Sequence, residues 1–205
     1  MALKFESDHP VTDESAKSAT GKTLAEWFEY LDGMDGLKIG RREINNHLYG
    51  LKLDPWWCTT ISVEYERARD VKKKDGLCEG YFICSTKTLS APIASAFRAW
   101  TDSGAFAKWF GDGVKAEVRE GGAYSTSNGV SGEFGRIREH KDIRMTMTGS
   151  MFTSPVQIEA QFQDKGGGKT GLLVNSTRIQ TRAEADGVRA EWAEALNRLK
   201  AMLEA

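Results

Sequence analysis

The sequence is poor in cysteine and has no long apolar run. Its three cysteines, Cys58, Cys78 and Cys84, are an odd set without a CxxC pair, so we expect reduced thiols in a cytoplasmic protein. Their spacing gives no support to a structural zinc site. No apolar stretch approaches the roughly 20 residues of a membrane-spanning helix. The opening residues, MALKFESDHP, lack the apolar core of a signal peptide.

Neither sign of charge is in excess. The chain carries 28 Lys and Arg against 29 Asp and Glu, for a formal net charge of -1. Bulk electrostatics therefore predict neither a nucleic-acid partner nor an acidic membrane partner. A composition of 40% hydrophobic and 28% charged residues is typical of a soluble globular protein. The 205 residues suffice for one ordinary domain or two small ones.

Patterns that carry acid–base, metal or phosphate chemistry are also scarce. The histidines His9, His47 and His140 fall in a polar tail, a weak helix and an expected turn, where surface positions are the rule. Residues 16–23, AKSATGKT, match a loose phosphate loop, but no apolar strand precedes them and only one glycine is present. Residues 166–170, GGGKT, read as a hairpin loop. We predict no catalytic residue, no metal ion and no cofactor.

The most regular pattern lies at the C-terminal end, where residues 181–205 read as one amphipathic helix. Thr181 and Glu184 fit a capping box at its start. Its apolar face is formed by residues at three- and four-residue steps: Val188, Trp192, Ala195, Leu196, Leu199 and Leu203. A helix of this length needs a surface against which to bury that face, and the strand-like residues upstream would supply it.

The first third of the chain is predicted to be helical. Apolar side chains from Leu24 to Leu31 follow one helical face, residues 41–49 form a weaker candidate, and Asp54 with Pro55 begins a further helix. We expect a small helical domain over residues 1–75, its aromatic residues in the core. These aromatic residues are Trp27, Phe28, Trp56, Trp57 and Tyr65. The charged segment VKKKDGLCE then reads as a linker.

From Gly80 onward the pattern changes to strands. The order is a strand, two helices that carry Phe97, Trp100, Phe106, Trp109 and Phe110, six further strands, and the C-terminal helix. The strands are expected at residues 81–89, 114–119, 123–127, 131–139, 143–148, 156–163 and 170–179. Tight turns such as Asn128–Gly129 imply antiparallel neighbours. We predict an α+β, helix-grip fold over residues 80–205, in which a curved antiparallel sheet wraps around the long C-terminal helix. A pocket is expected between helix and sheet.

Several motifs of this region resemble the SRPBCC (START-like, helix-grip) superfamily, in the branch of the heat-shock-protein-90 ATPase activator homologues. The motifs are STKTLSAP (85–92), FRAWTD (97–102), KWF (108–110), GGAY (121–124), SGEFGRI (131–137) and Trp192-x3-Leu196-x2-Leu199. The first domain resembles a small helical domain of unknown function that is often fused to such domains in bacteria. Its matching motifs are ATGKT (19–23) with Trp27, PWW (55–57) and YERAR (65–69). The resemblance implies a hydrophobic ligand cavity and no single activity.

Binding of a small hydrophobic or aromatic molecule is the first of three functions that fit. The candidate ligand-binding residues are Trp100, Phe106, Trp109, Phe110, Tyr124, Phe134, Met145, Met147, Phe162, Trp192 and Leu196. The alternative interpretation is that these side chains simply close the core.

The other two functions are an enzyme and a protein-interaction module. A cyclase or hydrolase would use the same cavity, with Glu133, Arg136 and Asn175 as the best inward candidates. A chaperone activator or regulator would bind a chaperone or another protein. However, the N-terminal domain does not resemble the chaperone-binding domain of eukaryotic activators. A monomer or a homodimer fits either function.

Overall fold

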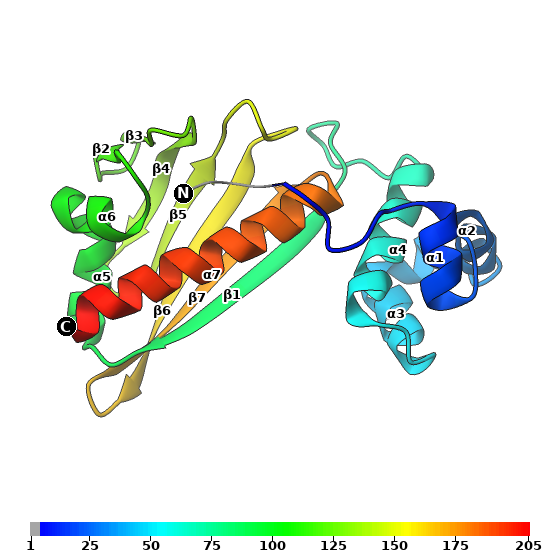
Figure 1. Cartoon of the computed structure of the whole chain (residues 1–205), viewed down its shortest axis with the longest axis horizontal. Coiled ribbons are helices and arrows are strands. Elements are labelled where there is room, and N and C mark those ends of the chain that lie inside the picture. The colour runs from blue at the N-terminus through cyan, green and yellow to red at the C-terminus, as the bar shows by residue number, and fades with distance from the viewer. Residues whose placement is uncertain (1–4) are drawn as a thin grey trace. The chain divides into compact units, whose positions relative to one another are not determined.

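The computed structural model describes residues 5–205 (Figure 1). They divide into two compact units. One unit is Ser7–Tyr81, and the other is Phe82–Ala205 together with residues 5 and 6. Each unit is treated by itself below.

The first unit consists of helices. They are α1 (Asp13–Thr20), α2 (Leu24–Asp32), α3 (Gly36–Gly50) and α4 (Pro55–Ala68). The helices expected over Leu24–Leu31 and from Asp54–Pro55 are present. Asp54 is an N-cap as predicted, and Thr23 caps the helix that begins at Leu24. The weaker candidate over residues 41–49 is the second part of α3, which begins earlier and contains a non-helical residue at Gly40. Helix α1 occupies most of the segment that resembles a phosphate loop, so no strand precedes a glycine loop there.

The core of this unit is aromatic, as the sequence predicts. Trp27, Trp57 and Tyr65 are buried, while Phe28 and Trp56 are partly buried and pack against them. Tyr65 also donates its hydroxyl to Asp32 at the end of α2, at 2.9 Å. Helices α2 and α4 are therefore joined by a polar contact beside their apolar packing.

The second unit is built on a seven-stranded sheet with the order β1-β7-β6-β5-β4-β3-β2. The strands are β1 (Tyr81–Leu89), β2 (Lys115–Ala116), β3 (Ala123–Ser125), β4 (Ser131–Arg138), β5 (Asp142–Met147), β6 (Val156–Gly166) and β7 (Lys169–Ile179). Neighbouring strands from β2 to β7 pair antiparallel. The predicted α+β helix-grip fold is confirmed. The expected strand over residues 114–119 is shorter than predicted, because the pairing of β2 with β3 covers only two residues.

Three helices accompany the sheet: α5 (Ile93–Thr101), α6 (Ser103–Trp109) and α7 (Arg182–Glu204). Helix α7 lies across one face of the curved sheet (Figure 1). The capping box of Thr181 and Glu184 is present with both of its hydrogen bonds, as the sequence predicts.

Alternation along the central strands decides which side chains lie beneath α7. In β5, Ile143, Met145 and Met147 are buried and Arg144 is exposed. The same period of two buries the β6 residues Val156, Ile158, Ala160 and Phe162. On α7, Val188, Trp192, Ala195, Leu196 and Leu199 are buried, and they supply the opposing apolar face. The inner face of the sheet and the apolar face of α7 thus bury one another.

Replacement of Trp192 by alanine should strongly destabilise this unit. Trp192 is 1% exposed and its ring stacks on Trp100, so Trp192→Ala is expected to lower the free energy of unfolding by about 3–5 kcal/mol. Urea denaturation followed by far-UV circular dichroism measures this loss. The control Glu194→Ala removes a solvent-facing carboxylate of the same helix and should change stability by less than about 0.5 kcal/mol. Equal effects of the two substitutions would contradict the assignment of Trp192 to the core.

Candidate functional site

A cluster of aromatic rings fills the space between α5, α6, α7 and the sheet. All eleven residues predicted to bind a ligand are buried here, and none is more than 6% exposed. Trp100 stacks on Trp192 at 5.9 Å between ring centroids, and Phe106 stacks on Phe110 at 4.4 Å. Tyr124, Phe134 and Phe162 join the same network through edge contacts. The structure brings the predicted set together as core packing, and a role in ligand contact stays a prediction.

The polar atoms of the aromatic cluster are mostly paired. The Trp192 indole donates to Ser176 Oγ at 3.0 Å, and the Trp109 indole donates to the Ala99 carbonyl at 2.8 Å. The Tyr124 hydroxyl donates to the Thr146 carbonyl at 2.8 Å, and burial raises its pKa far above the ordinary value. Trp100 Nε1 is buried without a hydrogen-bond partner. The cluster therefore offers apolar surface and one unused N–H donor, but no base or nucleophile.

A cleft lies beside the aromatic cluster, at the side of α5. Its volume is 440 Å³, within the range of about 300–1,000 Å³ that is typical of ligand pockets. It is lined by Ala94, Phe97, Arg98 and Thr101 of α5, Val118, and Ile137, Glu139 and His140 at the end of β4. The Phe97 ring contacts both His140, at 5.5 Å, and Phe162, at 5.4 Å. Phe97 thus connects the cleft to the buried cluster.

The sequence analysis did not identify this cleft. Helical spacing placed Phe97 on the apolar face of α5, together with Trp100, but periodicity cannot distinguish a cleft wall from a core position. Val118 belongs to the residues that were expected to extend a strand, whereas β2 ends at Ala116. Val118 therefore lies in the following loop and lines the cleft. The early end of β2, which no local pattern predicts, is thus what leaves Val118 outside the sheet.

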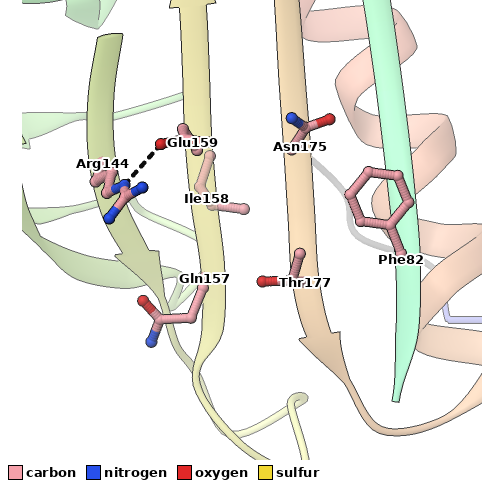
Figure 2. Close-up of a pocket in the computed structure, with 7 residues that line it drawn as sticks. All are labelled: Phe82, Arg144, Gln157, Ile158, Glu159, Asn175 and Thr177. Carbon is pink, nitrogen blue, oxygen red and sulfur yellow. Dashed lines mark hydrogen bonds and ion pairs between the residues drawn. The ribbon is translucent and has the colours of Figure 1, made fainter. Parts of the chain in front are cut away.

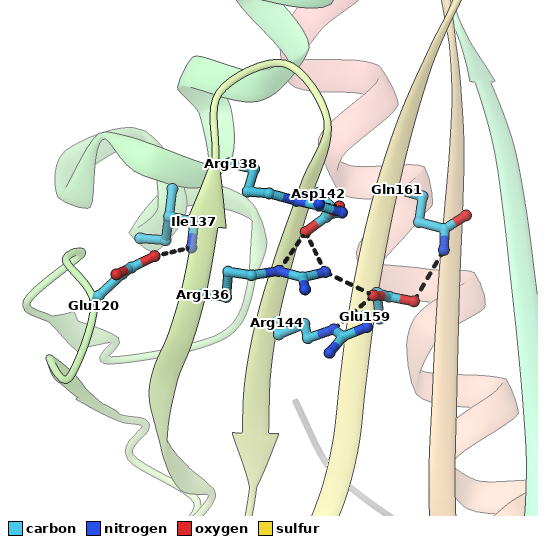
Figure 3. A network of polar contacts seen from close by, with 8 residues as sticks. All are labelled: Glu120, Arg136, Ile137, Arg138, Asp142, Arg144, Glu159 and Gln161. Atoms are coloured by element: carbon cyan, nitrogen blue, oxygen red, sulfur yellow. Dashed lines mark hydrogen bonds and ion pairs between the residues drawn. The ribbon is translucent and has the colours of Figure 1, made fainter.

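The three side chains predicted as inward catalytic candidates point away from α7, so that prediction is wrong. Glu133 is exposed, and Arg136 lies on the outer face, where its Nε donates to Asp142 at 3.0 Å and its Nη2 donates to Glu159 at 3.2 Å (Figure 3). Asn175 lines a groove on the same face (Figure 2). Burial of Phe134, Val174 and Ser176 fixes the inward side of β4 and β7, and alternation turns Glu133 and Asn175 outward. Arg136 lies two residues after Phe134 and faces outward because a β-bulge between them shifts the register.

The outer face carries a charged network rather than an acid–base pair. Hydrogen bonds from Arg138, which has the larger effect, and from Arg136 hold the pKa of Asp142 below its ordinary value. Arg144 does the same for the pKa of Glu159, and Gln161 assists through a hydrogen bond of 2.9 Å (Figure 3). Both carboxylates are therefore ionised at neutral pH, a state that suits ion pairing between strands.

One buried carboxyl was missed by the sequence analysis. Glu191 of α7 is 6% exposed, and its Oε1 accepts no hydrogen bond from the residues that the structure describes. Arg198 Nη2 lies 3.5 Å from that oxygen, while Arg198 Nε donates to the Trp109 carbonyl at 2.9 Å. Burial raises the pKa of Glu191, although Arg198 opposes the shift. The only signal in the sequence is its place next to Trp192 on the buried side of α7.

Metal binding and membrane insertion find no support within residues 5–205. No group of three or more His, Cys, Asp or Glu side chains is placed to hold a metal ion among these residues. None of the described helices combines the length and the apolar character required to cross a bilayer.

Comparison with known families establishes the relationship of this chain. Residues 90–204, more than half of the 205 residues, match the family described as Activator of Hsp90 ATPase homolog 1-like protein. The chain belongs to this family. The resemblance read from the motifs of residues 85–137 and from Trp192, Leu196 and Leu199 is thereby confirmed. Comparison with curated proteins gave no match.

Solved structures with the same fold include members with very different descriptions. CalU16 from Micromonospora echinospora is 20% identical with a TM-score of 0.54, over 60% of this chain and 75% of CalU16. PFC0360w, an HSP90 activator from Plasmodium falciparum, is 18% identical with a TM-score of 0.56, over 61% of this chain and 97% of its own. CV1439 from Chromobacterium violaceum is 22% identical with a TM-score of 0.52, over 60% of this chain and 97% of CV1439. At these identities the likeness shows the fold alone.

The buried position of Glu191 predicts a specific pH dependence of stability in this member of the Hsp90 activator homologue family. A carboxyl whose pKa is raised by folding binds its proton more tightly in the folded state. Stability therefore falls as pH rises from the unfolded pKa through the folded one. In Glu191→Gln this loss is absent, so the stability of the variant relative to wild type should increase from about pH 4 to about pH 7.

Urea midpoints measured across this pH range give the comparison. Glu194→Gln is the matched control, since Glu194 is exposed on the same helix and should show no such trend. A stability difference between Glu191→Gln and wild type that stays constant with pH would contradict the raised pKa.

Proposed function

We propose that the helix-grip domain is a binding module for a small apolar or aromatic molecule, held in the cleft beside α5. The observation that carries this proposal is the cleft itself, whose volume of 440 Å³ lies within the range of small-molecule sites. Phe97 lines the cleft and is 8% exposed, so part of an aromatic ring is available to a ligand there.

The chemistry of the lining favours a mainly apolar ligand with one polar end. Ala94, Val118 and Ile137 add aliphatic surface around Phe97. Arg98, Glu139 and His140 are exposed and supply polar groups of both charges. A ligand would bury its ring against Phe97 and direct its polar substituent toward these residues. The eleven buried residues predicted from the sequence would then act mainly as the rigid support behind Phe97.

A pair of valine substitutions tests this proposal. Val118→Trp places a large ring in the cleft, whereas Val114→Trp adds the same ring at a half-buried valine outside it. Indole, 2-naphthol and octanoate are suitable probes because they vary the ring and the polar end. We expect the best probe to raise the thermal midpoint of wild type and of Val114→Trp, because ligand that binds only the folded state stabilises it. The shift should be lost in Val118→Trp.

Two results would oppose the cleft as the binding site. One is the absence of a shift for every probe with wild type. The other is a shift that Val118→Trp retains in full although the variant is folded by circular dichroism.

The cytoplasm is the proposed compartment. Burial of the Cys58 thiol raises its pKa to about 11, so this thiol is unreactive at neutral pH, which is consistent with that proposal.

A second candidate function is regulation of a chaperone ATPase. It is favoured by the family match over residues 90–204 and by the likeness to an HSP90 activator along 97% of that protein's length. In this case the purified chain should raise the steady-state ATP hydrolysis rate of the Hsp90 homologue of the same cell, in proportion to complex formation. An unchanged rate at saturating protein would exclude this function without affecting the ligand-binding proposal.

A further inference from the structure

We propose a second small-molecule site, on the outer face of the sheet, for a neutral planar ligand that carries an N–H donor next to a carbonyl, such as an aromatic carboxamide. The site is a groove of 360 Å³ across β5, β6, β7 and β1. The argument uses Phe82, Arg144, Asn175 and Thr177 from its lining (Figure 2). It lies on the opposite face of the sheet from α7 and is independent of the cleft at Phe97.

The first observation is an aromatic ring where alternation would favour a polar side chain. Phe82 is 51% exposed, and its neighbours Tyr81 and Ile83 are buried. On the adjoining strands the outward positions hold polar residues, among them Asn175 and Thr177. Phe82 therefore forms one apolar wall of a polar groove, as Figure 2 shows. Such a wall suits the flat face of an aromatic ring.

The second observation is an acceptor without a donor. Asn175 Oδ1 is buried and accepts no hydrogen bond from residues 5–205, although buried side-chain oxygens nearly always have a partner. Asn175 lies opposite Glu159 in the β6–β7 register. The carboxylate of Glu159 is already used by Arg144, at 2.6 Å, and by Gln161, at 2.9 Å. A rotation of the Asn175 side chain toward the groove would let a ligand N–H satisfy this oxygen, which the described residues leave unused.

The third observation is a donor across the groove. Arg144 bonds Glu159 through Nε, and its side chain is 55% exposed. Its terminal nitrogens extend from that ion pair toward Gln157 in Figure 2. A guanidinium has more N–H donors than this one bond uses, so it can donate to a ligand carbonyl. Glu159 is shared by Arg144 and Arg136, so the choice between ligands rests on Asn175: a neutral amide supplies the N–H that its oxygen lacks, and a carboxylate does not.

Titration of the full chain with benzamide, followed by NMR or calorimetry, tests this site. Benzamide supplies a ring, a carbonyl and N–H donors, and a fragment of this size should bind with a dissociation constant of about 1–10 mM. N,N-dimethylbenzamide keeps the ring and carbonyl but has no N–H, and benzoate has no N–H and adds a charge. Both should bind at least about fivefold more weakly than benzamide, because Asn175 Oδ1 then stays unpaired.

Variants locate the binding. Asn175→Ala and Phe82→Ala should each weaken benzamide binding by about fivefold or more, while Asn175→Ala should lose the preference for benzamide over its dimethyl analogue. Gln163→Ala is the matched control: it lies on the same face of β6, outside the groove, and should leave the affinity within about twofold. The proposal is overturned by absence of saturable binding, by equal affinity for the two amides, or by unchanged affinity in folded Asn175→Ala.

Discussion

The stacking of α7 on the inner face of the sheet is the contact on which the second unit depends. Trp192 links α7 to two other elements at once, because its ring stacks on Trp100 of α5 and its indole donates to Ser176 of β7. The long C-terminal helix buries its apolar face against this surface and against the rings of α5 and α6. On the sheet, Met145, Ile158 and Val174 are almost fully buried in the same layer.

This packing explains why the proposed binding sites lie at the margins of the domain. The inner space is filled by large rings, and paired hydrogen bonds hold Trp109, Tyr124 and Trp192 in place. A cleft lies beside α5, lined in part by Val118 of the loop that follows the short strand β2. On the outer face the strands expose their polar residues, and Phe82 gives one groove an aromatic wall. The two proposed sites thus arise from different features: a short strand in one case, an exposed ring in the other.

Much of the fold was predictable from local signals. The C-terminal helix was predictable because its apolar spacing and the Thr181–Glu184 capping box indicate the same segment. The hairpins were predictable because turn sequences such as Asn128–Gly129 separate the strands. The sites were not readable in the same way. Inward and outward positions differ by one residue in a strand, which is how Asn175 was assigned to the wrong face. Arg136 was assigned to the wrong face because a β-bulge after Phe134 shifts the register of β4. The burial of Glu191 and the cleft at Phe97 depend on how distant elements meet, which no local pattern records.

The most direct test of the account is the place at which an apolar ligand contacts the domain. Intermolecular nuclear Overhauser effects between bound 2-naphthol and the assigned protein protons measure this. The account predicts contacts with the ring of Phe97 and with the methyl groups of Val118 and Ile137, which line the cleft beside α5. Bound 2-naphthol that contacts only other parts of the chain would contradict it.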